Sequence, residues 1–176
     1  PAAAICQEVA GQFRAIDELV TEDMGALQFG RLLAEKIRHE YSGHDIEFWG
    51  DPSGENRAQT DKTTPFQVLL AEGVAAVPTY TNDFTIRREA VANLMTRMTM
   101  TGEPAFLVSP KCKMLRKGLG GGYRYRRVQV AGDERYMDKP DKNMYSHICE
   151  ALQYAAVGAG KGTNVLGMDK SWSEAD

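Results

Sequence analysis

Apolar and polar residues recur along the first quarter of the chain with two different periods. Residues 2–9 and 13–20 form two extended runs joined at Ala10-Gly11, a connection that predicts a β-hairpin. Residues 24–41 then carry apolar side chains at every fourth position, and the glycine of Ser42-Gly43-His44 follows as a common helix stop. We therefore expect a helix with this apolar stripe: Phe29, Leu33 and Ile37.

The middle of the chain predicts a strand, a helix and a second strand in succession. Residues 46–49 are expected to form a buried strand, with Asp51 at its carboxyl end in a turn rich in Pro and Gly. After a polar stretch, Pro65 marks the first turn of a short helix that runs to Glu72, and an apolar strand follows at 74–77. A strand, a helix and a strand in this order predict a parallel unit.

Two more helices and a short strand complete the pattern. A strand is expected at 105–108, between the two helices. The second helix contains Glu150. His147, Glu150 and Tyr154 are expected on the face beside its apolar stripe. The stripes consist of Ile86, Ala90, Leu94 and Met98 in the first helix, and of Met144, Ile148, Leu152 and Ala155 in the second.

The composition agrees with one domain. The chain has 176 residues, of which 43% are hydrophobic and 26% are charged, which is enough for one buried core. We expect the domain to span residues 1–158, and the Gly-rich and acidic residues 159–176 to form a flexible tail. No apolar run is long enough for a membrane span or a secretory signal, so we expect a cytosolic protein. Its three cysteines lack paired metal-ligand spacing and are expected to be reduced thiols.

The net charge of the chain is −3, but the charges are unevenly distributed. The segment between Pro104 and Gly132 is basic and contains no acid. Such a segment can bind a phosphate backbone, or it can simply be a solvated face. We favour DNA contact, because the glycine cluster at 118–122 and the alternating Tyr and Arg residues that follow it predict an exposed loop and hairpin. The glycine cluster lacks the ending of a phosphate-binding ATPase loop. The basic residues are Lys111, Lys113, Arg116, Lys117, Arg124, Arg126 and Arg127.

Two carboxylates suggest a metal site. Asp51 is expected at a strand end and Glu150 on a helix face, and hard divalent ions such as Mg²⁺ often take only one or two protein carboxylates. His147 could orient water or the scissile phosphate, although a helix histidine is more often bonded locally. Asp141 is a further candidate ligand, whereas Asp138 and Asp141 could equally be turn or cap residues.

Four segments resemble, in the same order, the C-terminal nuclease domain of tailed-phage large terminase subunits. The similarity covers roughly residues 1–157. The segments are Gly50-Asp-Pro-Ser-Gly54, Thr81-Asn-Asp83 followed by Arg87-Arg88, Ser109-Pro-Lys-Cys112, and Lys142-Asn-Met-Tyr-Ser-His147.

The resemblance implies a ribonuclease H-like mixed sheet flanked by helices, with an inserted basic hairpin and three acidic metal ligands. Asp51 would be the second ligand and Glu150 the third, where the family commonly has Asp. The first ligand belongs to a first strand, but no acid precedes Glu8. We therefore expect that strand to lie outside the sequence given, while Glu8, Asp17 and Glu18 would replace its acid only by coincidence.

By this resemblance the chain would cut concatemeric double-stranded DNA with a site for two Mg²⁺ or Mn²⁺ ions, about 3.5–4 Å apart. Its partners would be DNA, the terminase ATPase domain, the small terminase subunit and the portal. It would act in the host cell cytoplasm and, transiently, at the procapsid portal. The alternatives are a non-catalytic module that binds DNA or the portal, and a resolvase-like or transposase-like relative of ribonuclease H. Arg87 and Arg88 would contact DNA or simply keep a surface helix soluble.

Overall fold

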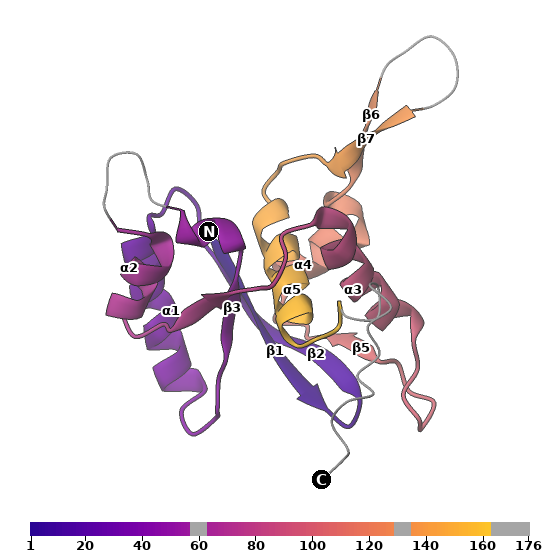
Figure 1. Cartoon of the computed structure of the whole chain (residues 1–176). Helices are drawn as coiled ribbons and strands as arrows, with labels where there is room; N and C mark the ends of the chain where they lie inside the picture. The colour runs from indigo at the N-terminus through magenta and orange to yellow at the C-terminus, as the bar shows by residue number, and fades with distance from the viewer. Residues whose placement is uncertain (57–62, 129–134, 163–176) are drawn as a thin grey trace.

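The computed structural model describes residues 1–56, 63–128 and 135–162, and these residues form a mixed α/β fold (Figure 1). Turn η1 (Pro52–Glu55) is a 3-10 helix, and η2 (Gly118–Gly122) is a π-helical turn. The strands are β1 (Ala2–Val9), β2 (Gln12–Val20), β3 (Phe48–Gly50), β4 (Ala76–Pro78), β5 (Phe106–Val108), β6 (Tyr125–Val128) and β7 (Arg135–Pro140). The helices are α1 (Ala26–Glu40), α2 (Pro65–Ala71), α3 (Phe84–Thr96), α4 (Lys113–Lys117) and α5 (Ser146–Gly158).

The strands pair in three groups within the described residues. β1 and β2 form the expected antiparallel hairpin, and β5 extends it in parallel beside β2. β3 and β4 pair in parallel across α2, which confirms the predicted strand-helix-strand unit. β6 and β7 form an antiparallel hairpin in the basic segment, and Figure 1 shows it extending away from the other strands.

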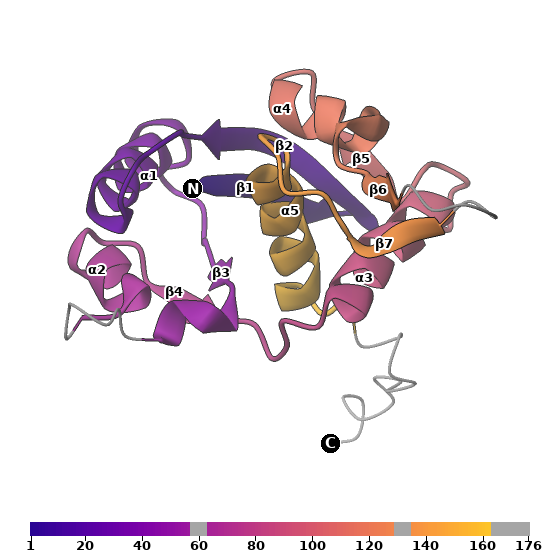
Figure 2. The ribbon, with the colours of Figure 1, turned by 90° about the horizontal axis from the view of Figure 1, so that it is seen from above.

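The hairpin of β1 and β2 lies between two groups of helices. Figures 1 and 2 show α1 and α2 on one side of it, and α3, α4 and α5 on the other. The larger core therefore lies under α5 and contains Leu94, Leu115 and Leu152, which are at most 2% exposed. A smaller core under α1 is built from Phe29, Leu33 and Val74.

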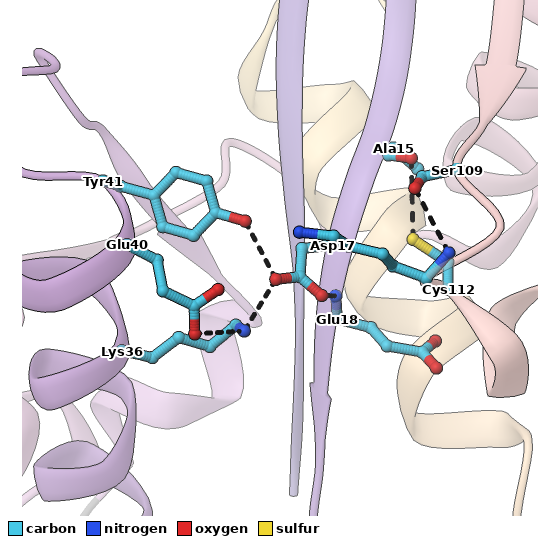
Figure 3. Close-up of polar contacts among 9 residues, drawn as sticks. Ala15, Asp17, Glu18, Lys36, Glu40, Tyr41, Ser109 and Cys112 are labelled. Atoms are coloured by element: carbon cyan, nitrogen blue, oxygen red, sulfur yellow. Dashed lines mark hydrogen bonds and ion pairs between the residues drawn. The ribbon is translucent and has the colours of Figure 1, made fainter.

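A β-bulge in β2 turns neighbouring residues of this strand toward opposite faces, one toward the larger core and the other toward α1. The partners of Ile5 and Cys6 are Asp17 and Ala15, so Ile16 is left unpaired. A bulge residue interrupts the regular alternation of side chains. Ala15 consequently packs in the larger core, whereas Asp17 points to α1 on the opposite face (Figure 3).

Asp17 is held on the α1 face by three contacts. Its carboxylate lies 2.6 Å from Lys36 Nζ and accepts hydrogen bonds from the Tyr41 hydroxyl at 2.9 Å and the Glu18 backbone N–H at 2.8 Å (Figure 3). Lys36 also lies 2.9 Å from Glu40 Oε1. These contacts fasten α1 to β2.

Several local predictions need correction. The strand expected at 46–49 is shorter and less buried, with Trp49 37% exposed. Helix α5 begins at Ser146, so Met144 lies outside it and is 54% exposed; helix α3 ends at Thr96, and Met98 instead forms an isolated bridge with Pro104. The glycine cluster at 118–122 is a helical turn and not an open loop. Most of the expected tail, 163–176, lies outside the described residues.

Candidate active site

Asp51 directly follows β3 and begins turn η1. Its Oδ1 accepts a hydrogen bond from the Ser53 backbone N–H at 2.9 Å, and Pro52 occupies the first position of the turn. This capping contact satisfies a backbone donor that the turn itself leaves without a partner. The prediction of Asp51 at the carboxyl end of a strand is confirmed, and its side chain is half-buried there.

Helix α5 brings a tyrosine to the Asp51 carboxylate. The Tyr154 hydroxyl is close enough to Asp51 for each group to affect the pKa of the other, and the Tyr154 residue is only 7% exposed. Burial raises the pKa of this hydroxyl most, and Asp51 and the charge of Glu150 raise it further, against the opposing charge of Arg87. Tyr154 was expected on the face beside the apolar stripe of the helix, and it is buried.

The surroundings of Asp51 favour its ionised form. Burial by itself would raise the pKa of the Asp51 carboxyl, but the hydrogen bond from Ser53, the nearby Tyr154 hydroxyl and the charge of Arg87 lower it below its usual value. Hydrogen bonds that donate to a carboxylate stabilise its charged form. The site therefore holds an oxygen anion at neutral pH, which is the form that a hard divalent ion binds.

The two roles considered for Arg87, a DNA contact and a solubilising surface residue, both assume an exposed side chain, and the structure shows a buried one. Arg87 is 7% exposed, and its guanidinium carbon lies 4.5 Å from the centre of the Tyr154 ring. Its Nη1 donates to Gln153 Oε1 at 3.0 Å and its Nε donates to the Asn82 carbonyl at 3.2 Å. The buried stripe Ala90-Val91-Leu94 of α3, continued one turn back, would have identified Arg87 as an inward-facing residue.

Glu150 lies on α5 one turn before Tyr154. Its side chain is 20% exposed and forms an ion pair with Lys142 through Oε1. His147 lies exposed on the first turn of α5. Asp141 is also exposed, and its backbone makes the contacts: its N–H donates to the Arg124 carbonyl at 2.9 Å.

The other acids considered as replacements for the first ligand are engaged elsewhere. Glu8 forms an ion pair with Lys161 (2.5 Å), and Asp17 is bound to α1. Glu18 accepts hydrogen bonds from the backbone N–H groups of Met114 at 2.7 Å and Leu115 at 2.9 Å, which caps the first turn of α4. Within the residues that the structure describes, no group of three or more His, Cys, Asp or Glu side chains is arranged to hold a metal ion. Asp51, Glu150 and Asp141 thus do not form one such group.

The basic segment occupies α4 and the β6–β7 hairpin. Glu18 holds the start of α4, and the Arg88 Nη1 donates to the Tyr125 hydroxyl at 3.0 Å, which connects α3 to the hairpin. All seven predicted DNA-binding side chains are exposed: Lys111, Lys113, Arg116, Lys117, Arg124, Arg126 and Arg127. They are therefore accessible to a partner from solvent.

Comparison of the chain with protein-family models, curated proteins and solved structures gave no match. The resemblance to terminase nuclease domains thus stays a prediction based on the four motifs. No helix in the described parts of the chain has the length and apolar character needed to cross a membrane.

Proposed function

We propose that the chain is the metal-dependent DNA endonuclease domain of a viral packaging terminase. The observation that carries this proposal is the packing of α5, which bears Glu150, against β3, which Asp51 directly follows. The two carboxylates come from distant segments of the chain, one from the end of a strand and the other from the closing helix.

The donor set fits Mg²⁺ or Mn²⁺. Both predicted ligands offer carboxylate oxygens, which hard divalent ions prefer, and a metal ion would have to displace the ammonium group of Lys142 from Glu150. A bound divalent ion would lower the pKa of an attacking water and stabilise the leaving oxygen of a phosphodiester. Asp51 would anchor such an ion through an ionised oxygen, and Glu150 would hold it from α5. His147 is exposed on α5 and in this proposal would contact the substrate.

By the resemblance the site would have a third acidic ligand, but the described residues contain no group of three such side chains. Among these residues β1 pairs only with β2 and β3 only with β4, while α5 packs against both β1 and β3. In this proposal the two sheets and α5 correspond to the ribonuclease H-like core.

The exposed basic segment supports a role in DNA binding. Its lysines and arginines lie on or next to α4 and β6, and the cap by Glu18 and the contact between Arg88 and Tyr125 fix these elements to the domain. Contacts to phosphate position a duplex without reading its sequence. The segment would therefore present double-stranded DNA to the site in a sequence-independent manner. Binding to the ATPase domain, the small subunit and the portal belongs to the same proposal, as does a location in the host cytoplasm and at the procapsid portal.

The second candidate is a non-catalytic module that binds DNA or the portal. The observation in its favour is that the described residues contain no cluster of three metal-ligating side chains. This module would use the exposed basic segment and would need no metal ion.

Nicking of supercoiled plasmid with Mn²⁺, Mg²⁺ or EDTA distinguishes the two candidates. The wild-type chain is compared with Asp51→Asn and Glu150→Gln, which remove charge while keeping size. Glu35→Gln is the matched control, because Glu35 is exposed on α1. Metal-dependent nicking that both site variants lose, and the control keeps, supports the nuclease. DNA binding by the wild-type chain without nicking or Mn²⁺ binding rejects the nuclease and supports the non-catalytic module.

A further inference from the structure

We propose that the β6–β7 hairpin binds duplex DNA through one of its two faces, the face that carries Arg126 on β6 and Arg135 on β7. The inference deepens the proposed function and rests on the part of it that concerns DNA binding. It adds Arg135, which lies beyond the basic segment recognised in the sequence. It also assigns Arg127, a neighbour of Arg126 in the sequence, to the opposite face.

The pairing of the two strands separates the side chains of the hairpin into two sets. Arg127 pairs with Tyr136, and Val128 pairs with Arg135. Residues that lie directly opposite each other in an antiparallel pair have their side chains on the same face, and successive residues of a strand alternate between faces. Arg127 and Tyr136 therefore share one face. Arg135 lies on the other face with Val128 and Arg126, and we call this the outer face.

The irregularity in this ladder lies in β7 and not in β6. Strand β6 has one residue, Arg126, between its paired residues Tyr125 and Arg127, whereas β7 has the residues 137–139 in the same interval. Extra residues disturb the alternation of the strand that contains them. The alternation along β6 is therefore regular, so Tyr125 and Arg127 share a face and Arg126 lies on the other.

Tyr125 fixes the orientation of the hairpin relative to the domain. Its ring makes an edge contact with the Phe84 ring at 6.4 Å between centroids, and its hydroxyl accepts a hydrogen bond from Arg88 Nη1 at 3.0 Å. Phe84 and Arg88 both belong to the first two turns of α3. The face of β6 that carries Tyr125 is consequently turned to α3, and the outer face with Arg126 is turned away from it.

The outer face offers positive charge on both strands of the hairpin. Arg126 and Arg135 are both exposed, and they occupy diagonal positions because Arg135 pairs with Val128, two residues after Arg126. Side chains at diagonal positions start about 7–8 Å apart. Among the described residues assigned to this face there is no acid that would neutralise the two guanidinium groups. An anionic partner is therefore the complement of this surface.

The shape of the hairpin favours duplex DNA among anionic partners. The hairpin extends away from the other strands (Figure 1), and a two-stranded ribbon fits the major groove of B-DNA, between two phosphate backbones. Proteins that bind single strands instead use aromatic rings on which the bases stack. The outer face as described carries Arg126, Val128 and Arg135 and presents no such ring.

The test compares single substitutions of three arginines in the same hairpin. Binding of a fluorescent duplex is measured by anisotropy at several salt concentrations. We expect Arg126→Gln and Arg135→Gln each to reduce the slope of log affinity against log salt concentration by about 0.9, because each removes one phosphate contact. Arg127→Gln is the matched control, because it removes the same group from the opposite face, and it should leave the slope unchanged. All three side chains are exposed, so thermal unfolding of the variants should match that of the wild type.

The outcomes separate this inference from the nuclease proposal. The inference is overturned if Arg135→Gln leaves the slope at its wild-type value, or if Arg127→Gln reduces it as much as Arg126→Gln. It is also overturned if the wild-type chain binds a single strand of the same length more tightly than the duplex. A wild-type chain that shows the expected pattern but does not nick plasmid rejects the nuclease and supports the inference. A wild-type chain that binds no duplex at low salt rejects the inference and the proposed DNA binding together.

Discussion

Asp17 Oδ2 lies 2.6 Å from Lys36 Nζ, and this ion pair joins β2 to α1 with side chains only 9% and 17% exposed. We expect Asp17→Asn to lower the free energy of unfolding by about 1–3 kcal/mol, because the Lys36 ammonium and the Tyr41 hydroxyl lose a charged acceptor. Urea denaturation measures the change. The control is Glu40→Gln, which breaks the more exposed pair with the same lysine and should cost about 0.5 kcal/mol or less. Equal losses in both variants would contradict the prediction.

The same ion pair predicts how stability depends on pH. For Asp17, burial would raise the pKa, but the contacts with Lys36, the Glu18 N–H and Tyr41 lower it overall. A carboxyl with a lowered folded pKa stabilises the fold above its unfolded pKa, and that contribution is lost as pH falls through the folded value.

The contribution of Lys36 to stability has the opposite pH dependence. Burial would lower the pKa of Lys36, but Asp17 and Glu40 raise it overall. Its contribution is present below the unfolded pKa and is lost as pH rises through the folded one. The stability difference between wild type and Asp17→Asn should therefore be largest between about pH 4 and about pH 10. Thermal unfolding measured across pH tests this, and a difference that is constant at all pH values would refute it.

Gly158 is expected to tolerate no side chain. Alanine would place its Cβ 2.3 Å from the Trp49 ring, so β3 and α5 would have to separate. We expect Gly158→Ala to cost about 1–3 kcal/mol and to shift the fluorescence of Trp49. Gly120→Ala is the control, because a Cβ there meets nothing within 4 Å. A shift of similar size in both variants would show that the contact between α5 and β3 is not the cause.

DNA affinity should depend on salt through the basic segment. Each phosphate contact contributes about 0.9 to the slope of log affinity against log salt concentration. We expect the double variant Arg124→Gln, Arg126→Gln to reduce the slope by about 2, measured by fluorescence anisotropy on duplexes of unrelated sequence. Arg38→Gln, on the exposed side of α1, should leave it unchanged. A slope that Arg38 alters as strongly as the hairpin arginines would mean that binding is not confined to the basic segment.

The elements were largely predictable from local sequence patterns. The hairpin of β1 and β2, the parallel unit of β3 and β4, and helix α5 follow from periodicity, a glycine turn and the proline at the start of α2. The turn after β3 was recognised from Asp51 and its Pro-Ser-Gly sequence. These features depend on residues close together in the chain, so sequence alone is informative about them.

The contacts between distant segments were not predictable in the same way. Arg87 was interpreted as a surface residue because arginine is rarely buried, and its acceptor Gln153 lies 66 positions away. Tyr154 was placed on the face beside the apolar stripe, because a helix pattern does not show that α5 also packs against β3. The ribonuclease H likeness, the nuclease activity and the metal preference remain predictions for the experiments described above.

The unpaired residue Ile16 determines which single-residue deletions in β2 the domain can tolerate. Ile5 and Cys6 are consecutive, so removal of Ile16 would join Ala15 and Asp17 into a continuous ladder opposite them. Ala15 would still face α5, and Asp17 would still face α1. Removal of Arg14 instead would reverse the faces of the residues before it and turn Phe13 out of the larger core. Single-residue deletions in this strand are therefore expected to be tolerated at one site and harmful at its neighbours.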